Sequence, residues 1–127
     1  MTDSLRRLYD DVRAAKGQDP ARSRTARLLL AGPLKIAKKV AEEAAEVALE
    51  SAAGNRQEVI RESADLLYHL VVLWSEAGVQ PRDIWAEMDR REKLYGIAEK
   101  IQKSPLAELK RLPKQVPVER TRQRRAR

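Results

Sequence analysis

Two pairs of acidic residues have a spacing that can bring four carboxylates together. Glu43 and Glu46 form one pair, and Glu62 and Asp65 form the other. Side chains three residues apart lie on the same face of a helix, so the two acids of a pair can act together. Gly54 begins a Gly-Asn turn dipeptide, and it lies midway between residues 46 and 62 and also between residues 43 and 65. An antiparallel helical hairpin that turns at Gly54 would therefore gather all four carboxylates in one small volume.

Four carboxylates at close range repel one another unless a cation or a shared proton offsets their charge. Oxygen ligands of this kind favour a hard divalent cation, so the two pairs predict a site for Mg²⁺ or Mn²⁺. The alternative is an acidic helix face in water, since glutamate is common on such faces. Alanine, valine and leucine residues surround both pairs, which indicates partial burial, and buried carboxylates need partners. This context favours the metal site.

The elements that would hold these acids are helices. The chain is rich in alanine, leucine, glutamate, lysine and arginine, which favour helix, and no segment alternates as a strand would. The sequence therefore predicts an all-α fold, a small bundle of four to five helices around a central antiparallel helical hairpin. The expected helices cover residues 5–16, 34–53, 56–77 and 81–100, and residues 26–31 fit a further short helix.

The hairpin helix over 56–77 carries apolar residues on several faces, so we expect it to be central or shared with a second subunit. A chain of this size supplies little cover for such a helix, which favours a homodimer. Trp74 and Trp85 are expected in the core. His69, the only histidine, either supports Asp65 or is an ordinary buried histidine. The expected buried stripe of the other hairpin helix consists of Ile36, Val40, Ala44, Val47 and Ala48.

The net charge of +7 belongs to the C-terminal end of the chain. Residues 1–109 contain 18 basic and 18 acidic residues, whereas residues 110–127 contain eight basic residues and one acid. We predict one all-α domain over 1–103 and a proline-containing, strongly basic, disordered tail over 104–127. The tail is either an anchor for nucleic acid or a solubilising extension, and its lack of stacking aromatics favours the extension.

Composition also bears on the compartment. The chain has no cysteine, so disulfides and zinc thiolates are excluded. Its N-terminus lacks a secretory signal, and the best apolar run, residues 66–74, is too short to span a bilayer. We expect a cytoplasmic protein.

Two segments of the chain form a recognisable pattern, and they read Lys-Ile-Ala-Lys-Lys-Val-Ala-Glu-Glu-Ala-Ala-Glu-Val over 35–47 and Glu-Val-Ile-Arg-Glu-Ser-Ala-Asp-Leu-Leu-Tyr-His-Leu over 58–70. They resemble the phosphoribosyl-ATP pyrophosphohydrolase family, of the all-α nucleotide pyrophosphohydrolase (MazG-like) superfamily. The double lysine and the Ala-Asp-Leu-Leu-Tyr-His run are specific to the histidine-pathway branch, and the resemblance covers roughly residues 5–95. It implies a homodimeric, Mg²⁺-dependent hydrolase that cleaves phosphoribosyl-ATP to phosphoribosyl-AMP and pyrophosphate in the second step of histidine biosynthesis.

The resemblance also implies roles for individual residues. Glu43, Glu46, Glu62 and Asp65 match the family's metal-binding positions. The neighbouring Glu42 would be a further ligand or a base for water. The remaining matched residues would contact substrate: Lys38 and Lys39 at the polyphosphate, and Ser23, Thr25 and Arg27 in a stretch near the substrate.

The sequence departs from the family pattern at two positions. Arg24 stands where the family usually has tyrosine, and Ala41 where it usually has glycine, so specificity could differ. A house-cleaning nucleotide pyrophosphatase would share the metal site and differ in the nucleoside pocket. A non-catalytic helical module with a nucleic-acid-binding tail is the second alternative, but such a module has no reason to keep four clustered acids.

Overall fold

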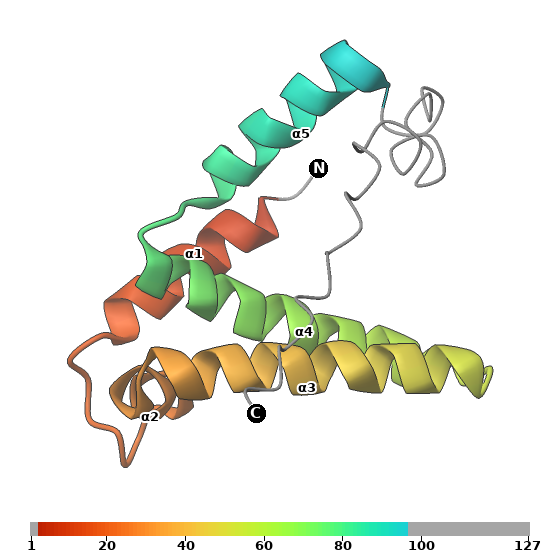
Figure 1. The fold of residues 1–127 in the computed structure, drawn as a ribbon. Helices are drawn as coiled ribbons and strands as arrows, with labels where there is room; N and C mark the ends of the chain where they lie inside the picture. Colours follow the sequence, from red (N-terminus) through yellow and green to blue (C-terminus); the bar gives the residue numbers. More distant parts are fainter. Residues whose placement is uncertain (1–2, 97–127) are drawn as a thin grey trace, which may run out of the picture. The chain divides into compact units, whose positions relative to one another are not determined.

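The computed structural model describes residues 3–96, and these form five α-helices (Figure 1). The helices are α1 (Ser4–Ala15), α2 (Arg24–Ala31), α3 (Pro33–Ala52), α4 (Arg56–Ala77) and α5 (Pro81–Tyr95). Residues 3–96 contain no strand, which confirms the all-α prediction. None of these helices has the length and apolar character needed to cross a membrane.

Residue contacts group Met1–Glu87 into one unit, which holds α1 to α4 and the first half of α5. The second half of α5 belongs to a unit that begins at Met88. Helix α5 ends at Tyr95, before the predicted end at residue 100, and Gly96 after it has a positive φ of +59°. The predicted domain boundary at residue 103 and the basic tail lie outside the described residues and stay predictions.

The helices α3 and α4 form the predicted antiparallel hairpin (Figure 1). Gly54 ends α3 with φ +73°, a left-handed conformation in which glycine carries no Cβ penalty. Its N–H donates to the Ser51 carbonyl at 3.1 Å, and the Asn55 N–H donates to the Glu50 carbonyl at 3.1 Å. This is the Schellman pattern, which satisfies the last carbonyls of a helix. The Asn55 side chain then accepts from the Glu58 N–H at 3.4 Å and caps α4, so the turn fixes the register of the hairpin.

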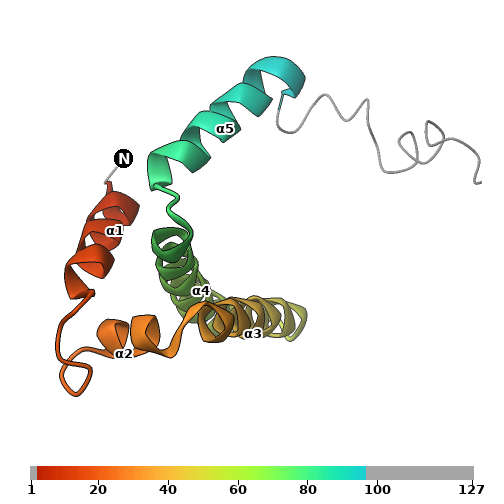
Figure 2. The same ribbon diagram turned by 60° about the vertical axis from the view of Figure 1, so that its left-hand side comes forward.

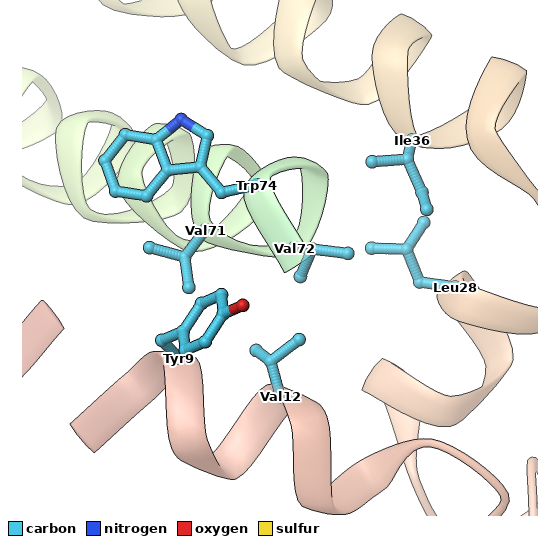
Figure 3. Close-up of a cluster of buried hydrophobic side chains, with 7 residues drawn as sticks. All are labelled: Tyr9, Val12, Leu28, Ile36, Val71, Val72 and Trp74. Carbon is cyan, nitrogen blue, oxygen red and sulfur yellow. The ribbon is translucent and has the colours of Figure 1, made fainter. Parts of the chain in front are cut away.

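A core of seven buried side chains lies at one end of the hairpin, where α1 and α2 pack against it (Figures 1 and 2). In Figure 3, Val71 of α4 faces Tyr9 of α1, and Val72 points towards Leu28 of α2. Burying a side chain of this size contributes about 1.5–3 kcal/mol relative to leaving it exposed. The core therefore fastens the ends of α3 and α4 that are far from the turn. Its members are Tyr9, Val12, Leu28, Ile36, Val71, Val72 and Trp74.

The half of the hairpin nearer the turn has less cover. On α3, Ile36 is 1% exposed, Val40 and Val47 are half-buried, and Ala44 and Ala48 are exposed. The prediction of a buried stripe was therefore wrong for Ala44 and Ala48, which are exposed in the single chain. The reason is that α1 and α2 pack near the other end, so that α4 is the main neighbour of this part of α3.

The apolar side chains of α4 also become more exposed towards the turn. Val71 and Trp74 are buried in the core, and Ile60 and Leu67 continue their stripe towards the turn. Ile60 is 48% exposed and Leu67 is 42% exposed, although both are large and apolar. The apolar stripe of α4 thus extends past the part of this helix that α1, α2 and α3 bury.

The two tryptophans have different environments. Trp74 is 9% exposed and belongs to the core, as predicted. Trp85 is 43% exposed, so its prediction as a core residue was wrong. Its neighbour Ile84 packs against the core instead, and successive residues of a helix point about 100° apart.

Candidate functional site

The hairpin brings the predicted acids together at its middle. Glu43 of α3 and Glu62 and Asp65 of α4 each offer a carboxylate oxygen, and these oxygens all lie within 4.8 Å of one another. Glu46, one turn after Glu43, is within hydrogen-bonding range of Glu62. The two pairs therefore face each other across the hairpin, in the register that the symmetric spacing about Gly54 predicts. We call these four residues the acid cluster.

The electrostatics of the acid cluster are unfavourable without a bound cation. The pKa of Glu62 rises from 4.5 to about 7. The largest cause is a hydrogen bond that protonated Glu62 makes to Glu46, followed by burial and by a hydrogen bond to Glu43. The negative charges of Glu46 and Glu43 raise the pKa further. Near pH 7, the protonated and the ionised forms of Glu62 are thus about equally populated.

Two oxygen atoms of the cluster have no hydrogen-bond donor among residues 3–96. Glu43 Oε2 and Glu62 Oε2 are both buried and lack a hydrogen-bond partner in the described structure. When all four acids are ionised they can only accept, so none of them can satisfy another. A buried carboxylate oxygen without a donor is costly, and a hard divalent cation satisfies several such oxygens at once. The donor set therefore fits Mg²⁺ or Mn²⁺.

His69 supports the turn of α4 that carries Asp65. Its ring is 1% exposed, and Nδ1 lies 2.7 Å from the backbone carbonyl oxygen of Asp65. A carbonyl only accepts, so Nδ1 carries the proton and donates. The contact is to the backbone of Asp65, and it holds the helix that presents the carboxylate.

Tyr68 links the acid-bearing helix to α2. Its hydroxyl lies 2.5 Å from the Thr25 hydroxyl, and its ring meets that of His69 edge-on with 5.0 Å between centroids. The Arg24 guanidinium, on α2, lies over the Tyr68 ring, 5.6 Å from its centroid. Tyr68 follows Asp65 by three residues on α4, so both side chains lie on one face of that helix.

Residues 5–92 match the family described as phosphoribosyl-ATP pyrophosphohydrolase. The chain belongs to this family. The matched range contains the whole hairpin and every residue of the acid cluster. The predicted resemblance is thereby confirmed.

Individual relatives agree with the family match. A protein named phosphoribosyl-ATP pyrophosphatase 2 from Rhodopseudomonas palustris is 64% identical over 104 residues, covering 82% of this chain and 79% of the relative. Its namesake from Bradyrhizobium diazoefficiens is 58% identical over 114 residues, covering 90% and 82%. A phosphoribosyl-ATP pyrophosphatase from Gluconobacter oxydans is 55% identical over 96 residues, covering 76% and 72%.

Glu42, beside the acid cluster in the sequence, faces lysines instead. Its carboxylate lies 3.9 Å from Lys38 Nζ and 3.6 Å from Lys39 Nζ, and it is not among the oxygens gathered at Glu43, Glu62 and Asp65. The Lys39 side chain is 35% exposed and that of Lys38 is 67% exposed. Two cations therefore stand one turn before the acids on α3, and Glu42 offsets part of their charge.

The stretch at the start of α2 is held by local hydrogen bonds. The Ser23 hydroxyl accepts from the Ala26 N–H at 3.0 Å and caps the helix. Arg27 donates from Nε to the Pro20 carbonyl at 3.2 Å. Arg24 and Thr25 of this stretch both reach α4 through Tyr68, the first over its ring and the second at its hydroxyl. The sequence prediction assigns no role of its own to Tyr68. Its place three residues after Asp65 was the signal for a position beside the acids.

Proposed function

We propose that this chain hydrolyses phosphoribosyl-ATP to phosphoribosyl-AMP and pyrophosphate with the help of Mg²⁺, as in the second step of histidine biosynthesis. The observation that carries the proposal is the acid cluster: four carboxylates on two facing helices, with two buried oxygens that lack donors among residues 3–96. The family match and the names of the relatives support the choice of substrate. Hydrolysis of a phosphoanhydride fits this chemistry because negative charge develops where the metal would lie.

In this proposal Glu43, Glu46, Glu62 and Asp65 hold the metal. A bound Mg²⁺ would offset the negative charge that grows on the phosphate oxygens during hydrolysis. Lys38 and Lys39 bind the polyphosphate, since both ammonium groups stand one turn from the acids. Glu42 orients these lysines and serves either as a further ligand or as the base that takes the proton of the attacking water.

The α2 stretch forms the neighbouring wall of the proposed site. Thr25 fixes Tyr68 by a hydroxyl contact of 2.5 Å, Ser23 holds the start of α2, and Arg27 is exposed on the same helix. In the reaction, the oxygen of water bonds to phosphorus and the bond to the bridging oxygen breaks. The proton of water passes to a carboxylate, and the pyrophosphate leaves.

We further propose that the protein acts as a homodimer in the cytoplasm. Ile60 and Leu67 extend a buried apolar stripe of α4 into solvent, at 48% and 42% exposure, and a second copy would cover them. Size-exclusion chromatography with light scattering tests this. A monomeric mass at micromolar concentration would refute it. The cytoplasmic placement is supported by a sequence without cysteine.

Pyrophosphate release from phosphoribosyl-ATP with Mg²⁺ tests the proposed reaction, with each common NTP and dNTP offered separately. Release that is lost in Asp65→Asn and kept in Glu76→Gln, an exposed acid elsewhere on α4, would support it. Release only from ordinary nucleotides would refute the substrate and indicate nucleotide clearance. Full activity in both Asp65→Asn and Glu46→Gln would refute the site.

A further inference from the structure

Arg24 of α2 is a cation without a carboxylate partner among residues 3–96. Its exposed guanidinium lies over the ring of Tyr68, on the helix that carries Glu62 and Asp65. Other arginines of the same unit have anionic partners, such as Arg6 with Asp3 and Arg61 with Glu58 at 2.8 Å. The positive charge of Arg24 is thus available to an anion from outside the chain.

The position of Arg24 is set by a small hydrogen-bonded unit. Thr25 and Tyr68 join through their hydroxyls at 2.5 Å, which fixes the ring on which the guanidinium lies. Tyr68 lies three residues after Asp65, about 4.5 Å along the axis of α4. The guanidinium belongs to α2 and lies 5.6 Å from the Tyr68 ring centroid. The contact with Tyr68 thus holds the positive charge of Arg24 at the turn of α4 that follows Asp65.

The contact with Tyr68 leaves the N–H groups of Arg24 without a hydrogen-bond partner among residues 3–96. A guanidinium can meet a ring through its flat face, while its N–H groups point outward in the plane and match the oxygens of a phosphate. A lysine would carry the same charge without this fork.

We propose that Arg24 binds a phosphate group of the substrate and thereby contributes to substrate specificity. This inference rests on the function proposed above. Phosphoribosyl-ATP carries phosphate in two places, the triphosphate chain and the phosphoribosyl group, and both present the same oxygens to a guanidinium. The two products separate these sources, since pyrophosphate derives only from the triphosphate and the phosphoribosyl phosphate stays on phosphoribosyl-AMP.

The test compares Arg24→Ala and Arg24→Lys with a matched control, Arg13→Ala. Arg13 also lies over a tyrosine, Tyr9, at 6.0 Å from the ring centroid, but on α1 and away from the acids. Removing a charged hydrogen bond to phosphate should raise KM for phosphoribosyl-ATP about tenfold to a hundredfold in Arg24→Ala, with kcat within about twofold of wild type. Arg24→Lys should recover part of the loss, and Arg13→Ala should match wild type.

Calorimetric titration with each product, without turnover, gives an independent measure. Weaker binding of pyrophosphate in Arg24→Ala assigns the triphosphate, and weaker binding of phosphoribosyl-AMP assigns the phosphoribosyl phosphate. KM and both product affinities equal to those of Arg13→Ala would overturn the inference and leave Arg24 as a clamp between α2 and α4. Wild-type protein that releases no pyrophosphate from phosphoribosyl-ATP refutes the proposed function separately. In that case, unchanged pyrophosphate affinity in Arg24→Ala overturns this inference too.

Discussion

Metal binding to the acid cluster should release a proton from Glu62. The pKa of Glu62 in the metal-free protein is about 7, because it shares a hydrogen bond with Glu46 and is partly buried beside Glu43. A carboxylate that binds a metal must be ionised. Binding of Mg²⁺ should therefore release about 0.9 of a proton per chain at pH 6, about 0.5 at pH 7 and about 0.1 at pH 8. The apparent affinity should be roughly tenfold weaker at pH 6 than at pH 8.

The assay is isothermal titration calorimetry with Mg²⁺ in buffers of different ionisation enthalpy, which counts the protons released. Glu62→Gln should bind Mg²⁺ more weakly and without proton release in this range. Glu76→Gln, which changes an exposed acid on the same helix, should behave as wild type. Absence of proton release at pH 6, or equal release by wild type and Glu62→Gln, would refute the account of the cluster.

The same pKa shift fixes how the stability of the metal-free protein depends on pH. Glu62 has an ordinary pKa of 4.5 and a pKa of about 7 in the folded chain, so between these values the folded chain holds more protons than the unfolded one. The contribution of Glu62 to stability is therefore fully present below pH 4.5 and is lost as pH rises to about 7. Thermal unfolding in EDTA should show a decline of Tm across this window that is smaller in Glu62→Gln. Identical pH dependence in the two proteins would contradict this sign.

Three further substitutions test the parts of the fold that hold the cluster. Gly54→Ala should lower the free energy of unfolding by about 1–2 kcal/mol in urea titration, because the left-handed φ of +73° is strained for alanine although its Cβ would meet no atom within 4 Å; an unchanged value would refute this. Ile36→Ala should cost about 2–5 kcal/mol in the same measurement, since the side chain is 1% exposed in the core, and a cost under about 1 kcal/mol would contradict the packing described. Tyr68→Phe removes the hydroxyl contact with Thr25 and should cost about 1 kcal/mol; a gain in stability would count against that contact.

The hairpin and its acids could be predicted because local signals agreed with each other. The Gly54 turn, the Asn55 cap and the symmetric acid spacing all specify one register, and the structure has that register. Periodicity alone does not show how far neighbouring helices extend. For this reason Ala44 and Ala48 were wrongly placed in the core. The start of α2 was missed by two residues, because its cap is Ser23 and arginine at position 24 carries no apolar signal.

The positions of the proposed site residues outside the cluster were harder to predict, since their side-chain partners come from distant segments of the chain. No local pattern indicates that Tyr68 meets Thr25, which lies 43 residues earlier in the chain. Glu42 shows the converse difficulty. It stands next to Glu43 in the sequence, yet a helix turns about 100° per residue, so its carboxylate faces Lys38 and Lys39 instead.

The layout of the hairpin separates stability from chemistry. Ile36 at one end of α3 and Val71 to Trp74 at the adjacent end of α4 pack in the core. The turn at Gly54 joins the opposite ends of the two helices. The mutually repelling acids lie between these two fixed points, so their repulsion acts against both the core and the turn. A hairpin held at both ends can keep the carboxylates close without a cation, at a cost that protonated Glu62 lowers. The cluster is thus assembled before any metal binds, which would favour the proposed binding of Mg²⁺ because little ordering remains to be done.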